Sequence, residues 1–408
     1  MFFKELCLTL QKYHKKHKTK KYRYTVVKMR LPIDTFKGLI TPFFCYDLSL
    51  LRNTLKVIND EIDGYPYIVH YALKANANPV ILREIVKSGL GADLVSGNEV
   101  LAAVDAGFSA GKMAYAGVGK TDREIEVGID NDIYCFNVES VPEMEVINDI
   151  AARKGKTAGI AIRVNPNIDA HTHRYITTGT TDNKFGIDIP VLDEVISLAM
   201  RLPHLHLHGL HFHIGSQITS LEPFRMLCEK VNELVDHYEK LGVNFEMIDV
   251  GGGLGVDYEN PQQNCIAPFK DFFSVFKQGL KLRHGQKVHF ELGRSIVAQC
   301  GALISKVVYV KENSIKKFVI LDAGMTDLIR PALYSAHHKI VNLSSQDVKN
   351  ETYDVVGPIC ESSDVFGIDE MMPITRRGDL IAILSAGAYG ESMASRYNMR
   401  DLPGSHFC

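Results

Sequence analysis

The sequence lacks the features that mark a secreted, membrane-embedded or nucleic-acid-binding protein. No run of about 18 apolar residues occurs in it, which excludes a membrane-spanning helix on sequence grounds. Lysine and arginine (46) nearly balance aspartate and glutamate (48), so the formal charge of -2 gives no reason to expect a nucleic-acid or membrane partner. The 8 cysteines are scattered, without a Cys-x-x-Cys pair or a secretory leader. We therefore expect reduced thiols in a cytoplasmic protein, with neither a disulfide framework nor a metal site.

Residues 1–28 differ in composition from the rest of the chain. A basic run at 14–21 follows a short apolar patch at 1–10, whereas a signal peptide places its charge before its apolar core. We expect this segment to be a disordered extension and Met29 to be the natural start. A truncated protein beginning at Met29 that lost folding or activity would contradict that expectation.

The remaining chain is long enough for two domains, with 46% hydrophobic and 23% charged residues. Short apolar runs alternate with stretches of helix-like apolar spacing, which is typical of βα units in a parallel sheet. About eight such strands in roughly 230 residues predict a (β/α)₈ TIM barrel, with a doubly wound open sheet as the alternative. The predicted strands are 68–73, 92–95, 113–116, 133–136, 160–164, 209–213, 247–250 and 288–291. The predicted helices are 78–88, 97–106, 121–129, 141–154, 190–201, 222–241 and 268–282.

After Arg294 the pattern changes to short β-branched strands without long helical stretches. This predicts a second, β-rich domain with a barrel or sandwich arrangement. Its expected strands are 296–310, 317–322, 339–343, 353–357 and 380–384. We expect residues 47–294 to form the barrel, residues 295–408 to form the β-rich domain, and residues 29–46 to join the β-rich domain.

Polar residues collect where the predicted barrel strands end. They are Lys74, Ser96, Asn137, Arg163, Asn165, His213, Gly251, Gly252, Gly253 and Glu291. In a barrel all these ends converge on one mouth, and the insertion at 167–186 is a candidate substrate-side loop. Lys74 follows an apolar run, where a lysine loses its proton more easily and becomes an amine nucleophile. A solvated surface lysine is the alternative.

Four features of the sequence could bind a phosphate. Each is a short glycine-containing or basic motif: Gly251–Gly255 after a strand, His213 with Ser216, Glu291 with Gly293 and Arg294, and Gly387 with Tyr389. Exposed backbone N–H groups of a glycine run can hold an anion, although this run is neither a dinucleotide fingerprint nor a P-loop. Each also has a structural alternative. The glycines can form a tight turn, His213 can be a packed core imidazole, and Glu291 can pair with Arg294.

The order of these motifs closely resembles the pyridoxal-phosphate-dependent amino-acid decarboxylases of the alanine-racemase fold, and among them the diaminopimelate decarboxylase family. The resemblance runs from about residue 41 to residue 407. It rests on 71–76, 211–217, the glycine run, 291–294, 322–334, 360–364 and 387–389. It implies decarboxylation of meso-diaminopimelate to L-lysine and carbon dioxide, with pyridoxal 5'-phosphate as cofactor.

The resemblance also implies a role for each motif. Lys74 would hold the cofactor covalently, His213 would lie against its ring, and Glu291 would pair with the ring nitrogen. The glycine run, Ser216, Gly293, Arg294 and Tyr389 would complete the cofactor site. The substrate would be bound by Arg294, Arg330, Tyr334, Glu361 and Tyr389. Cys360 would return a proton to the α-carbon.

In this family the Cys360 and Glu361 pair reaches the partner subunit's barrel, so a homodimer with shared active sites is implied. A buried structural cysteine is the alternative interpretation of Cys360. Two features depart from the family pattern. Leu292 stands where proline is usual, and the basic extension has no counterpart that we can identify.

Three other functions compete with this interpretation. A related decarboxylase acting on arginine, ornithine or carboxynorspermidine is the first, but a substrate with a single carboxylate leaves Arg330 without an anion. A racemase with the same cofactor is the second, and the Cys360 and Glu361 pair argues against it. A non-catalytic regulator of the same fold is the third, and the joint presence of Lys74, Glu291 and Cys360 argues against it.

Overall fold

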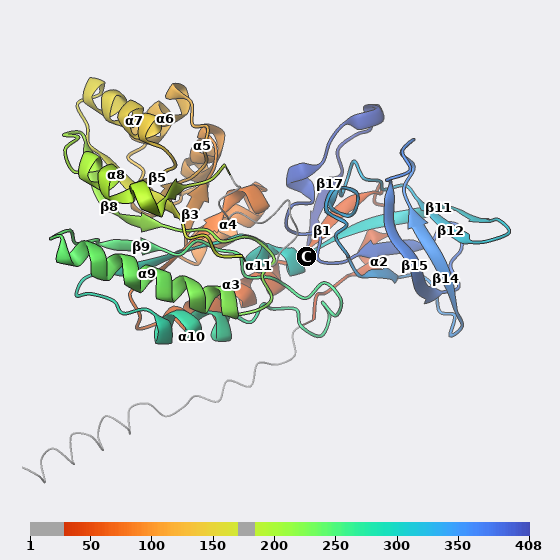
Figure 1. The fold of residues 1–408 in the computed structure, drawn as a ribbon. Helices are drawn as coiled ribbons and strands as arrows, with labels where there is room; N and C mark the ends of the chain where they lie inside the picture. Colours follow the sequence, from red (N-terminus) through yellow and green to blue (C-terminus); the bar gives the residue numbers. More distant parts are fainter. Residues whose placement is uncertain (1–27, 170–183) are drawn as a thin grey trace, which may run out of the picture.

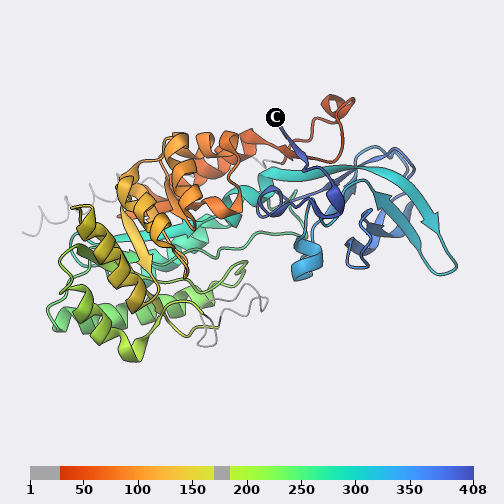
Figure 2. The same ribbon diagram turned by 90° about the horizontal axis from the view of Figure 1, so that it is seen from above.

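The computed structural model describes residues 28–169 and 184–408 and contains two sheets that lie side by side (Figures 1 and 2). One is a closed parallel barrel surrounded by helices, and the other is a mixed sheet formed mainly by the carboxyl-terminal part of the chain. Most of the predicted insertion at 167–186, and the predicted extension at 1–28 except its last residue, lie outside the described residues. Among the helices that are described, none is both long and apolar enough to cross a membrane.

Eight parallel strands close the barrel. Along the chain each strand pairs with the next, and the last pairs with the first. The strands are β2 (Tyr67–Ala72), β3 (Gly91–Leu94), β4 (Met113–Tyr115), β5 (Cys135–Val138), β6 (Ala158–Asn165), β8 (Leu205–His211), β9 (Met247–Asp249) and β10 (Lys287–Leu292). The predicted TIM barrel is therefore confirmed, and the open doubly wound sheet is wrong.

Helices cover the outside of the barrel, and most of them follow a strand (Figure 1). They are α3 (Leu48–Ile62), α4 (Pro79–Lys87), α5 (Gly97–Ala106), α6 (Asp122–Asp130), α7 (Val141–Arg153), α8 (Leu192–Ala199), α9 (Glu222–Lys240) and α10 (Phe269–Gly279). Side-chain caps fix several of their starts: Ser96, Thr121 and Ser140 each accept a hydrogen bond from the first turn. Ser96 thus starts a helix, and it is not among the residues that line the cavity.

The alternation of side chains along β10 shows how the barrel is assembled. Phe290 points outward, and its ring lies 5.0 Å from that of Phe273 and 5.1 Å from that of Phe276 on α10. The next residue, Glu291, points to the other side and reaches the interior. Packing of the helices on one face thus fixes which residues face the cavity.

The second sheet has the strand order β13-β16-β11-β12-β14-β15, and β1 lies between β11 and β17. Its strands are β1 (Phe43–Tyr46), β11 (Gly301–Glu312), β12 (Lys317–Leu321), β13 (Ile340–Asn342), β14 (Asn350–Val356), β15 (Val365–Pro373), β16 (Leu380–Ile383) and β17 (Gly404–Phe407). β1 pairs antiparallel with the start of β11, so the segment before the barrel takes part in this sheet.

The predicted elements differ from the structure in three ways. β8 starts at 205 instead of 209, and β5 is shifted by two residues from the predicted 133–136. Residues 296–300, predicted as strand, belong to the helical turns α11 (Arg294–Val297) and η5 (Ala298–Cys300). Several elements, among them α3, β1, β15 and β17, were not predicted from the sequence.

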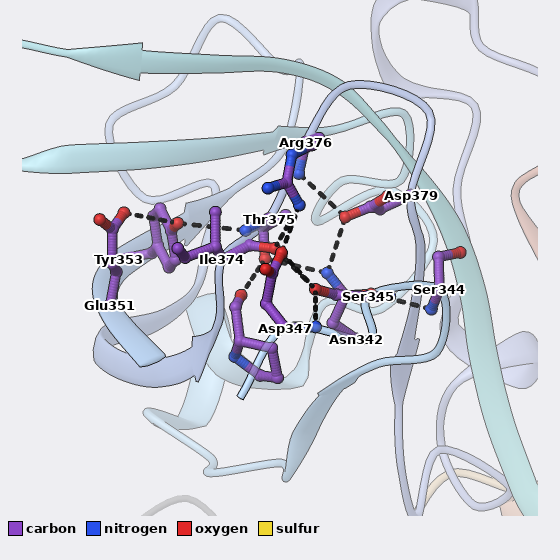
Figure 3. A network of polar contacts seen from close by, with 11 residues as sticks. Asn342, Ser344, Ser345, Asp347, Glu351, Tyr353, Ile374, Thr375, Arg376 and Asp379 are labelled. Carbon is purple, nitrogen blue, oxygen red and sulfur yellow. Dashed lines mark hydrogen bonds and ion pairs between the residues drawn. The ribbon is translucent and has the colours of Figure 1, made fainter. Parts of the chain in front are cut away.

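A network of polar contacts holds the loop before β16 against the end of β13 (Figure 3). The amide of Asn342 donates to Thr375 Oγ1 (3.0 Å) and to Asp379 Oδ2 (2.9 Å). Arg376 pairs with Asp347 on the same loop cluster. This network stabilises the β-rich sheet and includes no residue that lines the barrel mouth.

The second sheet is joined to the barrel beside Lys74. The backbone N–H of Tyr389 donates to the Ala75 carbonyl oxygen (2.8 Å), and Asn76 Nδ2 donates to the Gly387 carbonyl oxygen (3.0 Å). Asn76 Nδ2 also donates to the hydroxyl of Tyr46 on β1 (2.9 Å). The segment at 387–389 is therefore fixed directly against the loop that carries Lys74.

Candidate active site

A cavity of about 250 Å³ opens at the carboxyl ends of the barrel strands, where the second sheet meets the barrel. Ten of its lining residues were singled out from the sequence as site residues. They are Lys74, His213, Ser216, Gly253, Glu291, Gly293, Arg294, Arg330, Tyr334 and Tyr389. Residues from β2, β8, β10 and the β-rich part of the chain thus meet in one space, as the convergence of barrel strand ends predicts.

Lys74 lies on the short turn η1 (Leu73–Ala75) directly after β2. Its Nζ atom is 3.4 Å from Oδ2 of the buried Asp93 on β3. Burial alone would lower the pKa of Lys74, but the surrounding carboxylates, Asp93 foremost, raise the pKa above its ordinary value. The expectation that apolar neighbours make this lysine lose its proton more easily is therefore wrong for this structure, because Asp93 lies beside it.

Glu291 is held in a buried hydrogen-bonded position. Its Oε1 accepts from Asn137 Nδ2 (2.9 Å), and its Oε2 lies 3.1 Å from His211 Nε2. Burial opposes the charge, but the nearby basic groups, His211 foremost, hold the pKa of Glu291 below its ordinary value. The Glu291 side chain is thus a carboxylate that points into the cavity. Its hydrogen-bond partners are Asn137 and His211, and the alternative in which Glu291 pairs with Arg294 is wrong.

The glycine run after β9 packs closely against its neighbours. Gly251 and Gly253 have positive φ (67° and 101°), which favours glycine, and an added Cβ at Gly252 would collide with the Glu291 carbonyl oxygen. The backbone N–H of Gly252 donates to His213 Nδ1 (3.3 Å). That contact leaves Nε2 of His213 to carry the ring hydrogen. Burial, followed by the charge of Arg163, lowers the pKa of His213 to about 3, so the ring is neutral.

Two buried arginines contact Tyr258. Arg294 donates from Nη1 to the Tyr258 hydroxyl (2.9 Å) and from Nη2 to Ser216 Oγ (3.0 Å). The Arg330 guanidinium lies 4.8 Å from the centroid of the Tyr258 ring. The Arg330 Nε atom is buried and has no hydrogen-bond partner among the described residues. The cavity therefore holds two cations in a water-poor space, which is an arrangement that favours an anionic ligand.

Tyr389 reaches the cavity from the β-rich part of the chain. Its backbone has a positive φ of 56°, and its ring lies 5.0 Å from the Arg294 guanidinium.

Leu292, the departure from the family pattern, is buried and pairs in register with Tyr71 of β2, so this position still extends the barrel strand.

Cys360 and Glu361 do not join the other site residues within one chain. Both are exposed and neither lines the cavity. Glu361 Oε1 accepts from the Tyr397 hydroxyl (2.6 Å), and Cys360 N donates to Asn398 Oδ1 (3.5 Å). The alternative interpretation of Cys360 as a buried structural cysteine is wrong.

Two residues that contact the cavity-lining side chains, Asp93 and Tyr258, were not predicted from the sequence. Asp93 lies within a predicted strand, and its position one residue before the strand's end was the only available signal. Tyr258 comes from an irregular loop after the glycine run, and no motif surrounds it. Burial raises its pKa, but the charges of Arg294 and Arg330 outweigh that effect, so the pKa of Tyr258 is lowered.

Comparison with known proteins gives consistent matches along most of the chain. Residues 48–298 match the family described as "Pyridoxal-dependent decarboxylase, pyridoxal binding domain". The chain is 57% identical over 373 residues to the diaminopimelate decarboxylase of Bacteroides thetaiotaomicron, a match that covers 91% of this chain and 96% of that protein. The diaminopimelate decarboxylase of Aquifex aeolicus is 41% identical over 360 residues, which are 88% of this chain and 84% of that protein.

A solved structure agrees with these sequence matches. The diaminopimelate decarboxylase of Helicobacter pylori, complexed with L-lysine, superposes with a TM-score of 0.87 and 40% identity. The match covers 92% of this chain and 93% of that one, so it includes both sheets.

Proposed function

The chain belongs to the pyridoxal-dependent decarboxylases, within the diaminopimelate decarboxylase family, and on that basis we propose that it converts meso-diaminopimelate into L-lysine and carbon dioxide. The observation that carries the choice of substrate is the buried Arg330 guanidinium, whose Nε has no hydrogen-bond partner among the described residues. A buried cation of this kind is costly unless an anion pairs with it. The second carboxylate of diaminopimelate supplies that anion.

The residues around the cavity fit pyridoxal 5'-phosphate. Lys74 offers a primary amine for the pyridoxal carbonyl, and Glu291 offers a carboxylate held ionised for the ring nitrogen. The closely packed glycine run leaves no room for side chains, and Gly253 brings its backbone to the cavity, which suits a phosphate. We propose Gly251, Gly252, Gly253, Ser216, Gly293, Arg294 and Tyr389 for the rest of the cofactor site. When bound, the cofactor supplies a protonated ring that accepts the electrons left by departing carbon dioxide.

The chain's own residues would orient the cofactor and the substrate and would hold a proton on the cofactor ring. Asn137 and His211 hold the Glu291 carboxylate in place. That carboxylate would keep a proton on the ring nitrogen of a bound cofactor. The neutral His213 ring, which lines the cavity, would lie against the face of the bound cofactor. Arg294, Arg330, Tyr334 and Tyr389 bind the non-reacting end of the substrate, so that its other carboxylate lies at the reacting centre.

We propose that Cys360 and Glu361 act in the active site of a partner subunit. Both are exposed on the chain that bears them, beside the exposed side chains of Tyr397 and Met399. Cys360 would give the proton from its thiol to the α-carbon, and Glu361 would pair with the distal ammonium group. The active form is then a homodimer with shared sites. The described cysteines are all free, which supports a cytoplasmic location.

A direct assay separates this proposal from its competitors. The protein with pyridoxal phosphate is incubated separately with meso-diaminopimelate, ornithine, arginine and carboxynorspermidine, and both carbon dioxide and the amine product are measured. We expect lysine from diaminopimelate and far slower release of carbon dioxide from the other three. A faster reaction with any of those three would overturn the proposed substrate, and no reaction with any of the four would favour the regulator. Lys74→Ala is the matched inactive control.

A further inference from the structure

Three side chains that commonly bind metal ions converge at the amino-terminal end of the barrel, opposite the cavity. His206 and His208 lie near the start of β8, and Glu246 directly precedes β9. His206 Nε2 is 3.6 Å from Glu246 Oε1, and His208 Nδ1 is 3.3 Å from Glu246 Oε2. One donor atom of each residue lies within 4.8 Å of the other two. We propose that these residues form a binding site for a divalent first-row transition-metal ion, with Zn²⁺ as the probe.

The backbone holds the three ligands in place. Glu246 N donates to the His208 carbonyl oxygen (2.9 Å), and Lys287 N donates to the Glu246 carbonyl oxygen (2.9 Å), so Glu246 is fixed to strands on both sides. The rings of His206 and His208 lie 4.5 Å apart, centroid to centroid. Sites built on such rigid elements need little rearrangement when the ion binds.

The His208 ring is fixed more tightly than an ordinary surface histidine. It stacks on the Tyr134 ring at 4.3 Å, and it occupies space that a side chain at Gly159 would fill, because an added Cβ there would lie 2.5 Å from Nε2. The Tyr134 carbonyl oxygen lies on the same side of this ring as Nε2, because a Cβ added at Gly159 would collide with both atoms. Metal-binding histidines usually donate their second ring N–H to such an acceptor, which leaves the other nitrogen's lone pair for the ion.

His208 Nδ1 and Glu246 Oε2 form a hydrogen bond of 3.3 Å, in which the ring hydrogen lies between the two groups. A metal ion that takes the place of this hydrogen would bind the ring nitrogen and the carboxylate together. A proton would link only two groups, whereas His206 supplies a third donor on the other carboxylate oxygen. Three donors around one point suit a metal ion better.

The donor types favour a particular class of ion. Two imidazole nitrogens and one carboxylate oxygen suit Zn²⁺ and its neighbours, whereas Mg²⁺ and Ca²⁺ prefer oxygen ligands throughout. The side chains of His206 and Glu246 are 52% and 62% exposed, so an ion can enter and water can complete its coordination. The site is separate from the proposed cofactor cavity and does not depend on the proposed function.

Calorimetric titration of the chelator-treated, untagged holoenzyme with ZnCl₂ tests the proposal. The variants are His206→Ala and Glu246→Gln, which change the two exposed ligands. The matched control is His237→Ala, because His237 Nε2 lies 3.0 Å from Asp193 Oδ1 in an exposed pair that, among the described residues, belongs to no group of three metal-binding side chains. Loss of a supporting residue already weakens metal sites by about tenfold to 100-fold, so loss of a ligand should cost at least that much.

We expect both ligand variants to bind one Zn²⁺ fewer per chain, or to bind it at least about tenfold more weakly, while His237→Ala matches the wild type. An excess of Mg²⁺ should not compete. Absence of Zn²⁺ binding by the wild type, or equal binding by the wild type and Glu246→Gln, would overturn the proposal. Both ligand variants should decarboxylate at the wild-type rate without added metal, which checks that they fold.

Discussion

Asp93 controls the charge of Lys74, because its carboxylate lies 3.4 Å from the amine. Burial and the negative charge of Glu291 raise the pKa of Asp93 to about 7, in spite of the nearby ammonium. Above that pH, Asp93 is therefore charged and favours the protonated form of Lys74. Covalent attachment of pyridoxal phosphate requires the neutral amine. Asp93 thus opposes attachment in the cofactor-free protein while it holds Lys74 in position.

Asp93→Asn should shift the pH dependence of cofactor attachment toward lower pH. The amide keeps the shape of the side chain but removes the charge, so the pKa of Lys74 falls by about one to three units. A larger fraction of the lysine is then neutral at a given pH. The rate of appearance of the cofactor's absorption band, after pyridoxal phosphate is added to cofactor-free enzyme, measures this from about pH 6 to about pH 10.

The difference between variant and wild type should appear above about pH 7, where Asp93 becomes charged. Below that pH the protonated carboxyl and the amide behave alike, which gives an internal control. An unchanged profile, or a shift toward higher pH, would contradict the assigned role of Asp93.

Residues that belong to a motif were predictable, and isolated ones were not. Lys74, His213 and Glu291 each stand in a recognisable run of neighbours at a strand end. Asp93 and Tyr258 have no such neighbours, and their importance comes from contacts with residues far away in the chain. Such contacts are set by barrel closure and by loop packing, which no local pattern encodes.

Among the elements, the segment that follows β9 tolerates the least change. A Cβ at Gly252 would collide with the Glu291 carbonyl oxygen, and Glu291 is held by the Gly251 carbonyl through a 2.9 Å hydrogen bond. The glycine run therefore serves two purposes. It lets the backbone of β10 approach, and we propose that its Gly253 backbone borders the phosphate of the cofactor.

Gly252→Ala should destabilise the holoenzyme by about 1 to 3 kcal/mol and weaken pyridoxal phosphate binding. Thermal melting and cofactor titration measure the two effects. Gly119→Ala is the matched control, because an added Cβ there meets nothing within 4 Å. Equal melting temperatures for Gly252→Ala and the wild type would show that this segment adjusts without cost.

The barrel strands were predictable because burial on both faces gives continuous apolar runs. Residues 296–300 were predicted wrongly, since their β-branched residues are fully buried in helical turns and local propensity did not decide their conformation. β15 was missed because most of its residues are exposed or half-buried, so it lacks a clear apolar alternation. Tertiary packing decided both cases.

At the scale of the whole molecule, one chain holds the cavity but places two proposed catalytic residues elsewhere. Lys74 and Glu291 line the cavity, whereas Cys360 and Glu361 lie exposed on the β-rich part. The segment at 387–389 is bonded to the Lys74 turn of its own chain, so the β-rich part cannot swing round to bring Cys360 in without breaking these bonds. A second chain is the simpler source of the thiol.

A mixed dimer tests this arrangement. Lys74→Ala and Cys360→Ala chains are co-expressed with different tags, and the dimer that contains one of each is purified. If each site combines Lys74 of one chain with Cys360 of the other, one site is intact and the other carries both changes. We expect about half of the wild-type decarboxylation rate per dimer, although each parent homodimer is nearly inactive.

The matched control is the mixed dimer of a Lys74→Ala chain and a Glu291→Gln chain. Both changes lie in the barrel cavity, so neither chain supplies an intact barrel. That mixed dimer should stay inactive. If the Lys74→Ala and Cys360→Ala pair also stays inactive, Cys360 serves the barrel of its own chain and the shared-site homodimer is wrong. Activity in the first mixed dimer but not in the second would show that the Cys360 thiol acts in the barrel of the other subunit. If Lys74, Glu291 and Cys360 of one chain all served the same site, neither mixed dimer would contain an intact site.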